Sequence, residues 1–197
     1  MYGVVDMRKG KTRAFWRGLK AVAGLAAIAG LGTVLFVQPS TITAAPADKP
    51  NVRTAGSGLP VPRFVSLKSS KVNVRVGPGE DYGVAWVFVK PGLPIEVIQE
   101  FDNWRRIRDS DGQVGWVFQS LLSGKRTAVV APWQAGEPRP IRASGAADAR
   151  ITAYLEPGVM GNVDRCRSGW CRISGKGFEG WIAGDQLWGV YPGEDID

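Results

Sequence analysis

From residue 64 onward, apolar residues come in short runs that are separated by Gly, Pro, Asn and Asp. In the stretch 71–76, apolar and polar residues alternate, which puts Val72, Val74 and Val76 on one face of an extended segment. A period of two is typical of a half-buried β-strand. This part of the chain shows no apolar stripe with the period of a helix, so the pattern predicts an all-β fold.

Turn residues divide the stretch 71–118 into five short segments of this kind. The pairs that we expect to turn the chain are Pro91-Gly92, Asp102-Asn103 and Asp111-Gly112. The last of them is a preferred pair for a tight β-hairpin. Five short strands in succession predict a small barrel, because closure leaves no sheet edge exposed.

The segment 104–108, which reads WRRIR, divides its side chains between two faces. Alternation puts Trp104 and Arg106 on one face and Arg105 and Ile107 on the other. We expect Ile107 in the core. Trp104 then shares a surface with arginine, and such a surface suits a ligand that carries both carboxylates and apolar groups. In the alternative interpretation, Trp104 covers one end of the barrel and the arginine stems pack around it.

The same landmarks occur a second time in the chain. Pro91-Gly92 recurs as Pro157-Gly158 and Trp104 recurs as Trp170, both at an offset of 66 residues, while Trp116 recurs as Trp181 at an offset of 65. Three landmarks with a single one-residue gap indicate two copies of one fold. The sequence thus predicts tandem five-stranded barrels.

The N-terminal part of the chain has a different character. Six Lys and Arg residues precede an uncharged apolar run at 21–37, and Ala45-Pro46-Ala47 matches a small-x-small cleavage site. We expect an apolar helix that is either a cleaved signal peptide or a membrane anchor. Both alternatives send the rest of the chain to the periplasm or the cell envelope, and an uncleaved helix would hold it at the inner membrane.

These patterns divide the chain into five parts. We expect a targeting segment at 1–47, a flexible linker at 48–63, a first barrel at 64–130, a second barrel at 131–192 and an acidic tail at 193–197.

Charge and composition exclude several function classes. The whole chain has a net charge of +7, but the part beyond residue 47 has only +2, so the electrostatic support for a nucleic-acid partner disappears. The chain contains no histidine, which removes Ser-His-Asp and Cys-His catalysis and ordinary zinc hydrolase sites. We therefore expect a protein without enzymatic activity, cofactor or metal.

The two cysteines, Cys166 and Cys171, are separated by four residues that have Ser168-Gly169 at their centre. A hairpin loop of this length brings the two side chains face to face, and export favours their oxidation. We predict a disulfide rather than a metal site or a redox-active pair. Glu100 and Arg105 stand at the matching places of the first repeat, where we expect an ion pair.

These residues carry a resemblance to a known family. The first repeat contains VNVRVGPGEDYG, whose asparagine is Asn73, and further along KPGLPIEVI, NWRRI and GWV. These sequences resemble the bacterial SH3-like domain. Its first strand usually reads x-N-V-R-x-G-P-G, and its penultimate hairpin carries two tryptophans. The second repeat keeps Arg142, Trp170 and Gly180-Trp181 but lacks the Gly-Pro-Gly loop, so it resembles a divergent member.

The resemblance implies a barrel with an aromatic groove for an extended peptide. The residues expected in the groove of the first barrel are Tyr82, Trp86, Trp104, Arg106 and Trp116, although Trp116 also fits a packing role. Trp170 and Trp181 mark a second groove. We expect Val117 and Ile182 in the cores, and we expect Arg75 to hold the Gly-Pro-Gly loop through backbone carbonyls.

The function that follows is a binding module of the cell envelope whose partner is a cell-wall peptide or another extended peptide. The alternative is a protein-protein interaction adaptor for an envelope enzyme or a secretion complex. A third interpretation is a structural spacer without a ligand. The sequence predicts neither an oligomeric state nor whether the two barrels pack together.

Overall fold

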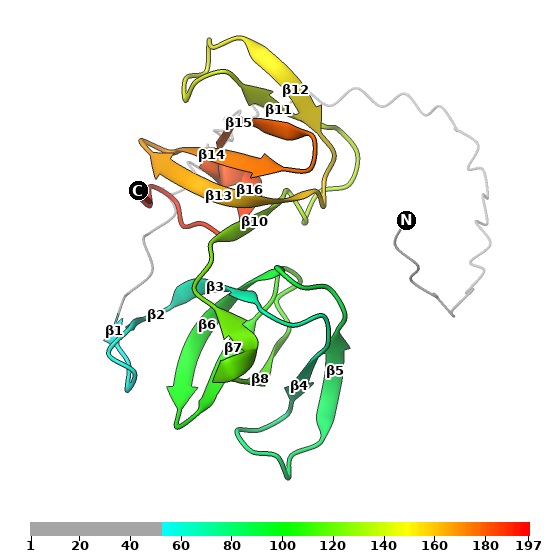
Figure 1. The fold of residues 1–197 in the computed structure, drawn as a ribbon, viewed down its shortest axis with the longest axis vertical. Coiled ribbons are helices and arrows are strands. Elements are labelled where there is room, and N and C mark those ends of the chain that lie inside the picture. The colour runs from blue at the N-terminus through cyan, green and yellow to red at the C-terminus, as the bar shows by residue number, and fades with distance from the viewer. Residues whose placement is uncertain (1–52) are drawn as a thin grey trace, which may run out of the picture. The chain divides into compact units, whose positions relative to one another are not determined.

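The computed structural model describes residues 53–197, which belong to one compact unit. The predicted targeting segment at 1–47 and the first residues of the predicted linker lie outside this described part. Residues 53–197 contain no helix that is long and apolar enough to cross a membrane. They form two large sheets and one small hairpin, as Figure 1 shows.

The first sheet contains the five expected strands and two more. Its strand order is β5-β4-β8-β7-β6-β3-β9. The bounds are β3 (Arg63–Leu67), β4 (Val72–Arg75), β5 (Val84–Phe88), β6 (Pro94–Phe101), β7 (Trp104–Arg108), β8 (Val114–Phe118) and β9 (Leu122–Ser123), with the 3-10 turn η1 (Gln119–Leu121) before β9. The prediction of an all-β fold is confirmed, and β3 and β9 extend the sheet at one end.

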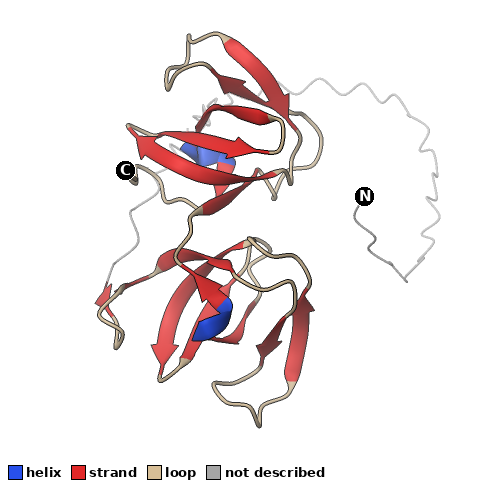
Figure 2. Cartoon of the chain, viewed as in Figure 1, coloured by secondary structure: helices blue, strands red, loops and turns tan. Residues whose placement is uncertain are grey.

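The second sheet repeats this topology strand for strand. Its order is β12-β11-β15-β14-β13-β10-β16. Each strand number is seven higher than that of the strand at the same place in the first sheet. The bounds are β10 (Thr127–Val130), β11 (Arg139–Arg142), β12 (Ile151–Leu155), β13 (Met160–Arg167), β14 (Trp170–Gly175), β15 (Phe178–Ala183), η2 (Gly184–Gln186) and β16 (Leu187–Trp188). The predicted tandem repeat is confirmed, and Figure 2 shows how little helix either copy contains.

Both sheets are irregular at the same places. The pairing shifts by one residue after Val74 in the first sheet and after Ile141 in the second. Such a bulge bends the strand. Val76, which we expected on the valine face, lies beyond the end of β4, and 67% of its surface is exposed.

Each sheet surrounds its own apolar core. Val72, Val74, Ile107 and Val117 of the first core are completely buried, as is Val97. The second core contains Ile141, Ile173, Ile182 and both cysteines. The predicted core positions at 107, 117 and 182 are therefore confirmed. Burying one such side chain contributes about 1.5–3 kcal/mol to stability.

A cross-strand link joins the same hairpin in each domain. In the second domain, Cys166 lies opposite Cys171 and the two form a disulfide, as predicted. In the first domain, Glu100 lies opposite Arg105, and the arginine Nε is 3.2 Å from the carboxylate. The expected ion pair is present, and both of its side chains are buried.

The boundary between the domains differs from the prediction, which placed residues 127–130 in the first barrel. Thr127–Val130 is β10, and it pairs with β13 and β16 of the second sheet. The apolar run TAVV can pack in either domain, and long-range pairing decides between them. The first sheet therefore ends at β9, and residues 124–126 connect the two domains.

Residues at the two ends of the described chain are also more ordered than expected. The predicted flexible linker contains a hairpin, β1 (Arg53–Thr54) with β2 (Pro60–Val61). Ser57 at its turn donates a backbone and a hydroxyl hydrogen bond to the carboxylate of Glu100.

The predicted acidic tail likewise contacts the second domain. Glu194 accepts two hydrogen bonds from the guanidinium group of Arg126. Ile196 exchanges two backbone hydrogen bonds with Cys166, at N–O distances of 2.8 and 2.9 Å. The last residues thus add a short bridge beside β13.

The two domains contact each other through aromatic side chains. Phe64 of β3 packs against Trp188 and Tyr191, at ring-centroid distances of 5.1 and 4.7 Å. The Tyr191 hydroxyl donates a 2.9 Å hydrogen bond to Glu96, whose carboxylate also pairs with Arg108. Because Glu96 is buried, these two partners supply hydrogen bonds that water would otherwise give to its carboxylate.

Removing the Tyr191 hydroxyl should weaken the contact between the domains. Tyr191→Phe leaves one oxygen of a buried carboxylate without its donor, so we expect the free energy of unfolding to fall by about 1–3 kcal/mol. Urea denaturation of both proteins measures the difference. Tyr154→Phe is the matched control, because Tyr154 is 62% exposed and should change stability by less than about 0.5 kcal/mol. Equal effects of the two variants would contradict this account of the contact.

Candidate functional site

The outer face of the first sheet carries the residues that the sequence singled out. Strand register places Trp104 between Phe101 on β6 and Phe118 on β8. In the next row, Arg106 and Arg75 lie on either side of Trp116. The face therefore combines a row of aromatic residues with a row in which arginine alternates with tryptophan.

A pocket of about 500 Å³ opens at Trp104. Its lining residues come from β4 and the segments next to it, from β7 and β8, and from η1: Lys71, Asn73, Arg75, Glu80, Trp104, Phe118, Ser120 and Leu121. The indole of Trp104 meets the ring of Phe118 edge to face, with centroids 5.4 Å apart. We name this the Trp104 pocket. Lys71 and Arg75 supply positive charge and Glu80 supplies negative charge around an aromatic floor.

Arg75 holds the loop that borders the Trp104 pocket. Its guanidinium group donates a 2.5 Å hydrogen bond to the carbonyl of Tyr82, as expected for a residue that fixes the Gly-Pro-Gly loop. The ring of Tyr82 lies so close to Gly77 that a Cβ at this position would be 2.3 Å from it. Tyr82 thus packs over the loop, outside the pocket lining.

Of the predicted groove residues, Trp104 lines the pocket and the others do not. Trp86 points toward the core and meets Phe88 edge to face at 6.1 Å. Trp116 and Arg106 lie on the outer face, one row away from Trp104. Sequence reasoning missed the residues that complete the lining, above all Phe118 and Lys71.

In the second domain, the loop that corresponds to the Gly-Pro-Gly loop packs close to the two tryptophans. Arg142 donates to the carbonyl of Ala149, with the same spacing as Arg75 and Tyr82, so Gly145 takes the place of Pro78. A Cβ on Gly145 would lie 3.0 Å from the Trp170 side chain and 3.1 Å from the Trp181 ring. The two tryptophans that mark the expected second groove therefore contact this loop.

Comparison with protein families decides what these two sheets are. The model of the bacterial SH3 domain matches residues 68–124 and again residues 135–189, which together make up more than half of the chain. The chain belongs to the bacterial SH3 domain family. The resemblance found in the sequence is thereby confirmed for both repeats.

Individual relatives are distant. The chain is 24% identical over 128 residues to YrvJ of Bacillus subtilis (strain 168), which is named as an N-acetylmuramoyl-L-alanine amidase. This match covers 61% of the chain but only 24% of that relative. Two solved structures, NlpC2 and NlpC1 from Trichomonas vaginalis, share 12% identity at a TM-score of 0.30. The matches cover 65% and 69% of the chain and 48% of each of those proteins.

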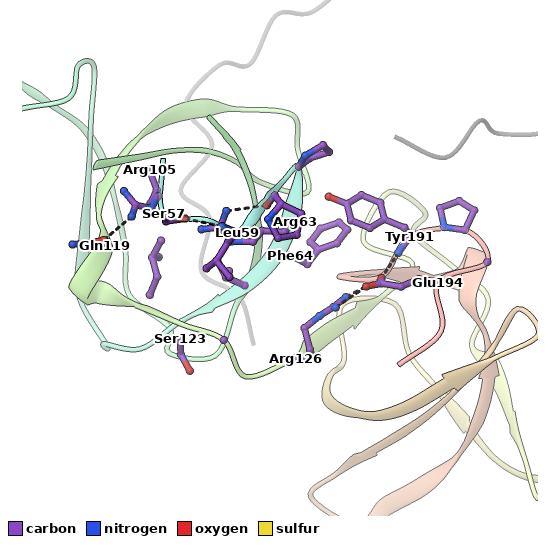
Figure 3. A pocket seen from close by; sticks show the side chains of 17 residues that line it. Ser57, Leu59, Arg63, Phe64, Arg105, Gln119, Ser123, Arg126, Tyr191 and Glu194 are labelled. Carbon is purple, nitrogen blue, oxygen red and sulfur yellow. Dashed lines mark hydrogen bonds and ion pairs between the residues drawn. The ribbon is translucent and has the colours of Figure 1, made fainter. Parts of the chain in front are cut away.

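A larger pocket of about 700 Å³ lies where the N-terminal hairpin and β3 of the first SH3 domain meet the C-terminal residues of the second (Figure 3). Leu59, Phe64 and Tyr191 form apolar walls. Its arginines are already paired: Arg63 and Arg105 bind Glu100, and Arg126 binds Glu194. The sequence did not predict this pocket, because it combines residues from both ends of the described chain.

No group of three or more His, Cys, Asp or Glu side chains within 53–197 is arranged to hold a metal ion.

The fold shifts the pKa of Glu100, a carboxylate beside the larger pocket. Burial alone would raise its pKa, but the backbone N–H of Ser57, Arg63 and Arg105 outweigh burial and hold the pKa of Glu100 below its ordinary value of 4.5.

The close packing of Gly145 leads to a testable expectation for the second SH3 domain. Gly145→Ala should push the loop away from Trp170 and Trp181, lowering the free energy of unfolding by about 1–3 kcal/mol and changing the tryptophan fluorescence of the folded protein. Gly124→Ala is the matched control, because a Cβ there meets nothing within 4 Å. An unchanged fluorescence spectrum and stability for Gly145→Ala would rule out the loop contact.

The lowered pKa of Glu100 predicts how stability depends on pH. Its ionised form contributes stability that is fully present above its ordinary pKa of 4.5, and this stability is lost as pH falls through the folded-state pKa. Glu100→Gln should cost about 3 kcal/mol at pH 7, and its deficit should shrink toward about pH 3. Urea unfolding across this range measures both. A deficit that is independent of pH contradicts the assignment, and Glu137→Gln at an exposed position serves as the control.

Proposed function

We propose that the first SH3 domain is a non-enzymatic binding module that recognises an extended cell-wall peptide in the Trp104 pocket. The observation that carries this proposal is the composition of the pocket, which joins an aromatic floor to both signs of charge. A peptide with an apolar body, a carboxylate and an amine complements such a site. The aromatic rings stack on the apolar body, Lys71 or Arg75 binds the carboxylate, and Glu80 binds the amine.

Each lining residue has a distinct role in this proposal. Trp104 and Phe118, which are both half-buried and line the pocket, offer their rings to the apolar part of the peptide. Lys71 and Arg75 bind the carboxylate, and Arg75 does so while its other contact fixes the loop. Glu80 binds the amine from the loop itself. Chemistry on the ligand is not part of this function, since the chain has no histidine and the site serves recognition only.

Two further observations support a ligand in the cell wall and a place in the envelope. The relative YrvJ is named for an activity on N-acetylmuramoyl-L-alanine, a cell-wall component, and the chain matches about a quarter of it. The basic segment and the apolar run at 21–37 favour export as a signal peptide or a membrane anchor.

A protein-interaction adaptor is the second candidate function. The same pocket would then bind an extended segment of an envelope protein, since SH3-type grooves recognise peptides by aromatic contact. Cross-linking in intact cells, followed by identification of the linked molecule, separates the two: cell-wall fragments favour the first function and a single protein favours the second.

Sedimentation with purified peptidoglycan sacculi tests the proposed function. The full chain should co-sediment, and Trp104→Ala should weaken binding at least about 30-fold, because a central aromatic contact is typically worth 2 kcal/mol or more. Trp133→Ala is the matched control, since Trp133 is 54% exposed and lies outside the pocket. It should bind as the unaltered chain does. The cell-wall version fails if the unaltered chain does not co-sediment or if the two variants behave alike.

A further inference from the structure

The strand β5 ends the first sheet, and its outer edge pairs with nothing in residues 53–197. An edge strand presents unpaired N–H and C=O groups to whatever extended chain approaches it. We name residues 84–89, which read VAWVFV, the β5 edge. Val84, Val87 and Val89 are 45%, 39% and 77% exposed, so apolar side chains accompany the unpaired backbone.

Other edges of the two sheets are protected in ways that the β5 edge is not. β9 and β16 are two residues long. β12, the counterpart of β5, is bounded directly by Arg150 and Glu156, whereas the β5 edge carries no charge within 84–89, begins after Gly83 and has a charged residue at one end alone, Lys90. Charges at an edge keep strands of other molecules away. The bulge of β5 lies at Ala85, near one end, and leaves 86–88 regular.

We infer that the β5 edge is an interaction surface for a second copy of this chain, which adds its own β5 in antiparallel orientation. Such a contact is symmetric, so the same uncharged strand must fit itself. With Val87 at the centre, Val87 lies opposite its own copy, and Trp86 lies opposite Phe88 of the partner copy. Every one of these pairs is apolar, and aromatic cross-strand pairs are favourable.

The faces of β5 agree with this register. Val87 pairs with exposed Asn73, while Trp86 and Phe88 pair with buried Val74 and Val72. Residues directly opposite each other in the dimer therefore share a face, as antiparallel pairing requires.

The contact should be weak on its own. A six-residue edge is small against the 1,200–2,000 Å² that stable interfaces typically bury, so we expect a dissociation constant on the order of micromolar to millimolar. Covalent trapping suits such a contact. Cysteines at directly opposed positions of an antiparallel pair lie within disulfide distance, and the chain's only two cysteines are already bonded to each other.

The test uses the full chain in mild detergent, because the run at 21–37 is apolar. The variants Val87→Cys and Val114→Cys are compared under a mild oxidant. Val114 is the matched control: it is the same residue with the same 39% exposure, but β8 is paired on both sides. We expect Val87→Cys to form covalent dimers at least about tenfold faster. Equal rates, whether both fast or both slow, overturn the inference.

A second pair of variants separates the β5 edge from other sources of association. Sedimentation velocity should show a concentration-dependent dimer that Val87→Lys weakens about tenfold or more and Val114→Lys leaves unchanged. A dimer that survives Val87→Lys, or a chain that stays monomeric throughout, contradicts the inference. Because Val87 is exposed, both of its variants should keep the fold, which near-UV circular dichroism verifies. The Trp104 pocket is not involved, so a loss of peptide binding would leave this result standing.

Discussion

The buried pair between Glu100 and Arg105 fixes the register of the β6–β7 hairpin on which the rest of the first domain depends. Arg105 lies on the inner side of β7 with Ile107, and the carboxylate opposite it is held by Ser57 and Arg63 as well. A slip of one residue would turn every side chain of β7 to the other face. Trp104 would then enter the core, and the outer face would lose its aromatic row.

In the second domain, a covalent bond links the two strands of the corresponding hairpin. Cys166 and Cys171 occupy the positions of Glu100 and Arg105, and both links cross the same hairpin. The outer faces have nevertheless diverged. Where Trp104 has Phe101 and Phe118 as cross-strand neighbours, Trp170 has Arg167 and Ala183. The second domain thus keeps the same scaffold, and Gly145 of its loop packs against its two tryptophans.

The strands of both domains could be predicted because they depend on local sequence. Alternation in 71–76 and 104–108, the turn pairs and the spacing of the landmarks led to β4, β7 and the tandem repeat, and the cysteine spacing led to the disulfide. What the sequence did not predict depends on distant partners. Ser57 binds Glu100 across 43 residues, and Arg126 binds Glu194 across 68. The order of the N-terminal hairpin and of the C-terminal residues comes from these contacts, which composition does not encode.

The same distinction applies to the candidate site. The period of two placed Trp104 and Arg106 on the outer face, but the pocket depends on which other strands and loops come close, and Lys71 and Phe118 lie 33 and 14 residues away in sequence. Trp86 was expected in the groove because it flanks the Gly-Pro-Gly loop. Its pairing with Val74 turns it toward the core instead, since both lie on the inner face.

The most direct test of the central claim is to follow the indole N–H resonances of the eight tryptophans by nuclear magnetic resonance while a soluble cell-wall peptide is added to the full chain. Each indole has a single N–H donor, so each tryptophan reports separately. The account predicts that the Trp104 signal moves with the peptide concentration while those of Trp170 and Trp181 stay in place. A shift of Trp170 or Trp181 without one at Trp104, or no shift at all, would contradict it.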